Sequence, residues 1–194
     1  MKKFIYALSI LALVFTSCTK DELDRTIFVP DEENPSLPAY TEWGYNSFGA
    51  EYERSVFVAT NSIVPCKIVY KSNTLSFPLI GRYNRNDMTL TFSFPLSQVK
   101  TIGELSILND YVIDLKNGAT VSLTVNSSQT ILDVTDGQLY FKRFQLLRVD
   151  GQVNRIILSG TFDLKFLRNG LPESMSDGRF DMGITDRDFY SYIN

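Results

Sequence analysis

The sequence predicts an all-β domain, an antiparallel β-sandwich, on two observations. From Ser55 onward, apolar and polar residues alternate with a period of two along many short segments, as in strands that bury one face. Dipeptides typical of tight turns separate these segments. We expect about nine or ten strands with short connections. A lipocalin-like closed β-barrel is the alternative, because its strands alternate in the same way.

The alternation is clearest in four segments. Along 88–94, Leu90, Phe92 and Phe94 share one face, while threonine and serine occupy the other. A strand with one apolar and one polar face is typical of an antiparallel sheet that packs on a core from one side. The same pattern recurs in three further segments, which are 66–71, 120–126 and 161–167.

Local exceptions to the alternation predict where strands bend or end. The phase changes at Arg143 and Phe144, which indicates a β-bulge at that point. Pro78 and Pro95 lack a backbone N–H, so they belong at sheet edges or strand ends. Only the segment 97–109 has apolar residues spaced for a short helix.

Turns are predicted where asparagine or aspartate precedes glycine, because both residues tolerate a positive φ. The clearest hairpin is at Asp150-Gly151, between the apolar segments 144–149 and 153–158. Four other dipeptides have the same chemistry: Asn117-Gly118, Asp136-Gly137, Asn169-Gly170 and Asp177-Gly178. The chain end at 188–193 is predicted to form a last strand or a docked tail.

The first 38 residues differ from the rest of the chain. Lys2 and Lys3 precede an apolar run over 4–15, which is shorter than the roughly 20 residues that a transmembrane helix needs. A basic tip followed by such a run predicts a signal peptide over 1–17. Acids and prolines then dominate 18–38, which predicts an extended, disordered tether. A single β domain is expected over 39–194.

Thr16-Ser17-Cys18 and the apolar run before it resemble the lipobox of Bacteroidetes-type lipoproteins. The resemblance implies that Cys18 carries lipid, with palmitate among the acyl chains, and that the signal peptide is cut before it. Several chains on one residue would anchor the protein stably in a membrane. Lys20, Asp21 and Glu22 are similar to the export signal of these lipoproteins. They imply an outer-membrane location facing the cell exterior, with the periplasmic leaflet as the alternative.

The C-terminal third also resembles small β-rich lipoproteins of this type, a family of unknown function. The likeness lies in Ser159-Gly160-Thr161-Phe162 and in Ser176-Asp177-Gly178-Arg179-Phe180-Asp181. From the residues themselves, Phe180 and Met182 are expected in the core. Arg179 and Asp181 share the opposite face, where they could pair with each other or with Asp163 and Lys165.

Composition excludes several classes of chemistry. The chain has no histidine, which removes histidine-dependent nucleophiles, bases and metal ligands. With Cys18 lipidated, Cys66 has no partner for a disulfide, and we expect it in the core. The net charge of −3 becomes more negative when Lys2 and Lys3 are removed, so nucleic-acid binding is not expected. No metal or cofactor is predicted.

Aromatic residues are the candidates for a binding surface. Trp43, Tyr45 and Tyr190 lie near the two ends of the predicted domain, where exposed rings could stack on sugars. Carboxylate pairs are the only catalytic groups that composition leaves available. The candidates for a remote glycosidase alternative are Glu51, Glu53, Asp163, Glu173 and Asp181.

These observations predict a lipid-anchored surface lipoprotein that is a binding module and not an enzyme. Polysaccharide is the candidate ligand, and the membrane is contacted through lipid on Cys18. The alternative is a structural or assembly component of an outer-membrane surface complex, with a surface protein as partner.

Overall fold

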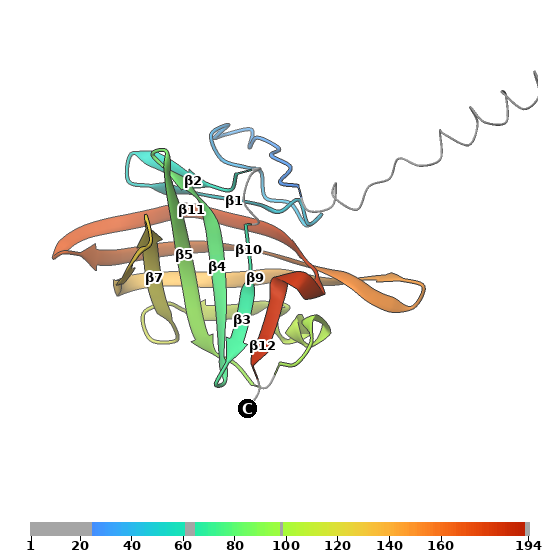
Figure 1. Ribbon diagram of the computed structural model, residues 1–194. Helices are drawn as coiled ribbons and strands as arrows, with labels where there is room; N and C mark the ends of the chain where they lie inside the picture. The colour runs from blue at the N-terminus through green and yellow to red at the C-terminus, as the bar shows by residue number, and fades with distance from the viewer. Residues whose placement is uncertain (1–24, 61–64, 98, 193–194) are drawn as a thin grey trace, which may run out of the picture.

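The computed structural model describes residues 25–60, 65–97 and 99–192 (Figure 1). Within these residues it contains a sheet of twelve strands and two short 3₁₀ helices. The strands are β1 (Ser47–Tyr52), β2 (Ser55–Val58), β3 (Ile68–Lys71), β4 (Thr74–Tyr83), β5 (Asn86–Pro95), β6 (Tyr111–Asp114), β7 (Thr120–Val125), β8 (Ser128–Ile131), β9 (Asp133–Val149), β10 (Gln152–Arg168), β11 (Leu171–Ile184) and β12 (Phe189–Tyr192). The helices are η2 (Ile102–Leu108) and η3 (Asp186–Asp188).

The strands follow one path, in the order β6-β9-β10-β11-β1-β2-β4-β5-β7-β8. Pairing along this path is antiparallel, and β3 joins β4 to β12, with β12 parallel to β3. Among the described strands, the two ends of the path, β6 and β8, do not pair with each other, so the sheet is not closed into a barrel. The all-β prediction is confirmed, and the arrangement is consistent with a β-sandwich.

Two halves of the sheet face each other and enclose an aromatic core. In Figure 1, β4 and β5 cross in front of the long strands β9, β10 and β11. Phe77 of β4 lies 5.2 Å from Phe141 of β9 and 5.1 Å from Phe180 of β11, measured between ring centroids. Phe92 of β5 lies 5.4 Å from Phe162 of β10. All five rings are buried, which confirms that the alternating apolar faces point inward.

The predicted helix is present and is shorter than expected. The segment 97–109 contains η2, whose Ile102, Leu105 and Leu108 are buried. A spacing of three residues matches the three residues per turn of a 3₁₀ helix, so all three side chains meet the core. The last strand, β12, confirms the prediction for the chain end.

The hairpin and the bulge were both predicted correctly. Asp150-Gly151 connects β9 to β10, and Val149 pairs with Gln152 across the turn. The register shifts farther along the same pair of strands, where Arg143 is opposite Ser159 but Phe141 is opposite Gly160. Lys142 is therefore the extra residue of a β-bulge, next to the predicted position.

Two of the predicted turns are wrong. Asp136-Gly137 lies within β9 and Asp177-Gly178 lies within β11. A Cβ atom on Gly137 would lie 2.5 Å from the carbonyl oxygen of Asp163, so this glycine permits close approach of strands. Asp177 has a φ of 51° at a register shift of β11. A positive φ serves a bulge as well as a turn, and the dipeptide alone does not distinguish them.

Pro78 lies inside β4 but on an edge that is locally unpaired among the described strands, and Pro95 ends β5, both as expected. On the edge of β4 away from β5, β3 pairs only with 74–76 and β2 only with 82–83. Pro78 falls between these two short ladders, where no described strand requires its N–H.

The predicted tether over 18–38 is wrong for its second half. Leu37 is completely buried, Pro30 bridges Pro38, and Ile27 donates its backbone N–H to the carbonyl of Tyr45 at 2.8 Å. These contacts offset the conformational entropy that the segment loses when it becomes ordered, and they cannot be predicted from its composition. The rest of the tether, with Cys18, Lys20, Asp21 and Glu22, and the signal peptide 1–17 lie outside the described residues. None of the helices that the structure describes is both long and apolar enough to cross a membrane.

Candidate functional site

The residues just before β1 form a loop over the outer face of β10 and β11. We call residues 41–45 the Trp43 loop. The side chain of Trp43 is 72% exposed, the highest value among the exposed large hydrophobic residues. Gly44 has a φ of +71°, and a Cβ atom there would lie 3.1 Å from Ile157 and 3.3 Å from Gly183. Glycine thus lets the loop backbone turn and lie directly on the sheet.

Asp181 of β11 holds the loop from below. Its Oδ2 atom accepts hydrogen bonds from the Thr41 hydroxyl at 2.5 Å and from the backbone N–H groups of Trp43 at 3.1 Å and Tyr45 at 3.2 Å. Its Oδ1 atom accepts one from the N–H of Gly44 at 2.7 Å. Asp181 is only 1% exposed, and hydrogen bonds to a charged acceptor are among the stronger ones in proteins. The carboxylate therefore fixes the loop through three backbone N–H groups and one side-chain hydroxyl.

Arg155 of β10 holds the same loop from the other side. Its guanidinium donates to the carbonyl of Gly44 at 2.7 Å and to the Asn46 side-chain oxygen at 3.3 Å. That oxygen also accepts the N–H of Gly183 at 2.9 Å. Arg155 is 7% exposed, and a Cβ atom on Gly183 would lie 1.7 Å from its Nη2 atom. Gly183 thus leaves the space in which the buried guanidinium lies.

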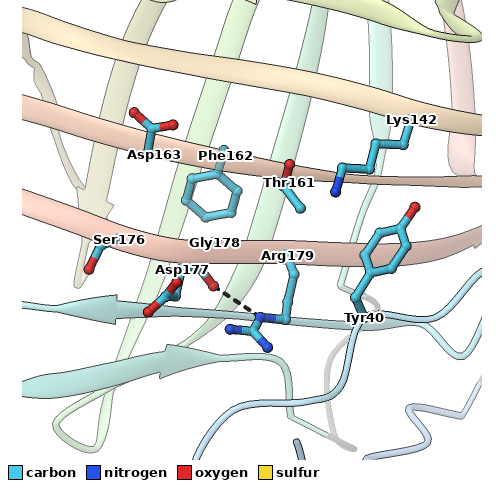
Figure 2. Close-up of a pocket in the computed structure, with 9 residues that line it drawn as sticks. All are labelled: Tyr40, Lys142, Thr161, Phe162, Asp163, Ser176, Asp177, Gly178 and Arg179. Carbon is cyan, nitrogen blue, oxygen red and sulfur yellow. Dashed lines mark hydrogen bonds between the residues drawn. The ribbon is translucent and has the colours of Figure 1, made fainter. Parts of the chain in front are cut away.

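A shallow groove of about 510 Å³ adjoins the loop on the outer face of β9, β10 and β11. We call it the Tyr40 groove. Figure 2 shows the side chains from these strands together with Tyr40, which comes just before the loop. The lining residues are Tyr40, Lys142, Thr161, Phe162, Asp163, Ser176, Asp177, Gly178 and Arg179.

The two ends of the groove differ in charge. At one end the Lys142 ammonium lies 4.9 Å from the centre of the Tyr40 ring and 5.9 Å from that of Tyr140. At the other end lie Asp163 and Asp177, both exposed to solvent (Figure 2). The groove is thus polarised, with an aromatic ring beside its cationic end.

Arg179 borders the groove but is already engaged. Its guanidinium donates to Asp31 at 2.7 Å and to the carbonyl of Asp177 at 3.1 Å. Backbone hydrogen bonds from Asn34 and Glu33, together with Arg179, lower the pKa of Asp31 against the opposing effect of burial. The ion pair ties the segment before the Trp43 loop to β11.

Glu42 connects the groove to the Trp43 loop. Its carboxylate accepts the Tyr40 hydroxyl at 3.0 Å and lies 3.9 Å from Arg143, while its carbonyl accepts the side-chain amide of Gln145 at 3.1 Å. Burial, followed by the hydrogen bond to Glu42, raises the pKa of Tyr40 to about 12. The loop and the groove therefore form one continuous surface over β9, β10 and β11.

The structure brings together two of the three predicted aromatic residues. Trp43 and Tyr45 share the loop, with the Tyr45 side chain half-buried. Tyr190 is 41% exposed and lies on β12, opposite Val69 of β3. In Figure 1, β12 lies well below the segment that precedes β1, so Tyr190 belongs to a different surface.

The sequence did not identify the residues that hold the loop. Asp181 was expected to pair with a neighbouring charge, but Arg179 pairs with Asp31 and Lys165 with Asp136. The sequence contains one indication that the outer face of β10 is covered. Ile156, Ile157 and Leu158 are consecutive apolar residues, and all three are buried. Such a run indicates that both faces of a strand are covered.

Most of the acids proposed for a glycosidase have structural roles. Besides Asp181, Glu173 accepts hydrogen bonds from Tyr52 and Arg168. Glu51 accepts the side-chain amide of Asn34, and Glu53 accepts the backbone N–H of Ser174. Of the five, Asp163 alone lines the Tyr40 groove.

The remaining cysteine is part of the core, as predicted. Cys66 is 4% exposed, and burial, with a smaller effect of Asp188, raises the pKa of its thiol well above the usual range. Within the described part of the chain, no three cysteine, aspartate or glutamate side chains are grouped so that they could hold a metal ion.

Comparison with known proteins gives no relative for this chain: no protein family, curated protein or solved structure matches it.

Proposed function

We propose that the protein is a lipid-anchored surface lipoprotein that binds polysaccharide without altering it, and that the Trp43 loop is its contact surface. The observation that supports this proposal is the position of Trp43. Its indole is 72% exposed on a loop that the buried side chains of Asp181 and Arg155 hold in place.

The energetics of the loop favour a binding role. Removing a charged group from water costs several kcal/mol unless hydrogen bonds replace its hydration. Asp181 and Arg155 meet this cost by bonding to the loop backbone, which leaves the tryptophan side chain in solvent. A rigid aromatic surface loses little conformational freedom on binding, so more of the contact energy appears as affinity.

The acids of the groove also favour binding over catalysis. A glycosidase acid is a carboxyl whose pKa is raised by a buried environment. Asp163 and Asp177 are instead exposed, which suits them to accept hydrogen bonds from sugar hydroxyls. We therefore rank the glycosidase alternative below binding.

The anchor is proposed from the sequence around Cys18. Thr26 donates its hydroxyl to the carbonyl of Thr60, and Ile27 donates its backbone N–H to the carbonyl of Tyr45, so contacts with the domain begin eight residues after Cys18. At no more than about 3.5 Å per residue, Thr26 can lie at most roughly 28 Å from Cys18, so lipid on Cys18 would keep the domain near the membrane surface.

A glycan array tests the binding proposal. The full chain is prepared with Cys18→Ala, so that no lipid interferes, and is compared with the same protein carrying Trp43→Ala. Tyr190→Ala is the matched control, because Tyr190 is an exposed aromatic residue on a separate strand. We expect glycan binding that Trp43→Ala abolishes and Tyr190→Ala leaves intact. Absence of binding to every glycan would overturn the proposal.

A second candidate function is assembly into a surface complex, which the edge strand β8 favours. All four residues of β8 are exposed and uncharged, and Ile131 is 71% exposed. Edge strands without charges or prolines are open to pairing with another chain. In this case Ile131→Lys would reduce cross-linking to a surface protein on intact cells and leave glycan binding unchanged.

A further inference from the structure

We propose that the Tyr40 groove is a subsite for an acidic sugar, with the carboxylate of a uronic acid residue bound at Lys142. This inference rests on the proposed polysaccharide binding and adds the chemical class of the ligand. Three observations support it: the position of Lys142, the salt bridges that the neighbouring cations already form, and the opposite charges at the two ends of the groove.

The bulge in β9 places the cation. Phe141 points into the core, and regular alternation would direct every second residue after it inward. Because Lys142 is the extra residue at the register shift, Lys142 and Arg143 are both exposed on the outer side. Bulges commonly redirect a side chain beside a functional site, and this one directs an ammonium group toward the groove (Figure 2).

Lys142 differs from the neighbouring cations in having no acidic partner within the part of the chain that the structure describes. Arg143 lies 3.9 Å from Glu42, and Arg179 lies 2.7 Å from Asp31. Among the described residues Lys142 forms no salt bridge and contacts the faces of Tyr40 and Tyr140 instead. An anion that binds here would form a charge-assisted hydrogen bond without first displacing a carboxylate.

The opposite end of the groove limits what kind of anion fits. Asp163 and Asp177 would repel a second negative charge, but they can accept hydrogen bonds from sugar hydroxyls. A uronic acid residue joined to a neutral sugar has a carboxylate at one end and hydroxyls at the other, which matches this order. The volume of about 510 Å³ lies within the range of small-ligand pockets.

The groove and the Trp43 loop would bind neighbouring units of one glycan. Tyr40 forms a wall of the groove and bonds to Glu42, which is the residue before Trp43. The ring of Tyr40 and the indole of Trp43 are therefore presented by one short stretch of chain. In this arrangement Trp43 provides affinity for sugar rings, and Lys142 selects the acidic residue.

The experiment compares acidic oligosaccharides with their neutral equivalents. Oligosaccharides of hyaluronan, unsulfated chondroitin and heparosan, in each of which a uronic acid alternates with a neutral sugar, are titrated by calorimetry against the full chain with Cys18→Ala, beside the carboxyl-reduced form of each. The two forms of a pair differ in charge but keep the sugar backbone. We expect about tenfold tighter binding of the acidic form for at least one pair, an advantage that falls as salt increases.

Lys142→Gln tests the position of the carboxylate. It should remove the preference for the acidic form and leave binding of the reduced form unchanged. Lys165→Gln is the matched control, because Lys165 is also exposed on the sheet but pairs with Asp136. Circular dichroism confirms that each variant is folded.

The outcomes separate this inference from the function on which it rests. If some glycan binds in a Trp43-dependent way, but the acidic and reduced forms of every pair bind equally or Lys142→Gln changes nothing, the uronate subsite is wrong and polysaccharide binding stands. If neither these oligosaccharides nor any glycan on the array binds, both proposals are overturned.

Discussion

Asp181 and Arg155 hold the same residue, Gly44, from opposite sides. The carboxylate of Asp181 accepts the N–H of Gly44 at 2.7 Å, and the guanidinium of Arg155 donates to its carbonyl at 2.7 Å. Two buried groups of opposite charge, which lie on the neighbouring strands β10 and β11, thus bind one loop residue. The residue next to Gly44 is Trp43, so this pair determines where the most exposed large hydrophobic side chain of the described chain lies.

Asp181→Asn should release the Trp43 loop. An amide has one acceptor oxygen, and its NH₂ group would face N–H groups of the loop that now bond to a carboxylate. We expect the free energy of unfolding to fall by about 2–4 kcal/mol, measured by urea titration. Trp43 is the only tryptophan, so a drop in its fluorescence anisotropy would report the freed loop directly. Asp163→Asn, at an exposed position, should change neither quantity, and an unchanged anisotropy in Asp181→Asn would contradict the role of the carboxylate.

Gly183→Ala should displace Arg155. The added methyl group would lie 1.7 Å from the guanidinium, and overpacking of this kind costs about 1–3 kcal/mol of stability. Urea unfolding measures the loss. Gly103→Ala is the control, because the nearest atom to its added Cβ is 3.9 Å away. Equal stability of the two variants would show that the guanidinium is not confined as described.

The hydroxyl of Tyr40 should titrate late in alkaline solution. Its neutral form donates a hydrogen bond to Glu42, and burial and that contact raise its pKa from 10.0 to about 12. Because the pKa of Tyr40 is higher in the folded state, its neutral hydroxyl stabilises the fold. This stabilisation is complete below pH 10 and is lost as pH rises from 10 to 12. The tyrosinate absorbance of the wild type minus that of Tyr40→Phe should have its midpoint near pH 12. A midpoint near 10 would mean that Tyr40 is free in solvent.

Cys18→Ala should abolish lipid attachment, because its thiol is the proposed acceptor. We expect the variant to lose labelling by radioactive palmitate and to leave the membrane fraction. Cys66→Ala is the matched control and should keep both, since Cys66 is buried in the core. Palmitate labelling of Cys18→Ala would show that the lipid is elsewhere or that the lipoprotein proposal is wrong.

Local patterns predicted the strands well but predicted some connections poorly. Alternation identified the inward faces of β5, β7 and β10, on which Phe92, Leu123 and Phe162 are buried. Gly137 and Gly178 looked like turn residues but lie inside long strands, where a Cβ atom would meet the backbone of the next strand at 2.5 Å and 2.4 Å. A glycine needed for close approach and one needed for a turn have the same local sequence, so only the strand beside it distinguishes them.

By itself, the sequence determined the fold class, the inward faces of the strands, the bulge in β9 and the last strand, since each depends on side-chain spacing within a few residues. Only the tertiary structure decided that the outer face of β10 and β11 is covered, and that the Trp43 loop covers it. Asp181 meets Gly44 across 137 positions of the chain, and no local pattern encodes that contact. The alternation of apolar and polar residues predicts which side of a strand faces the core. A buried charge on the opposite side of the strand is stable only when a distant segment supplies hydrogen bonds to it.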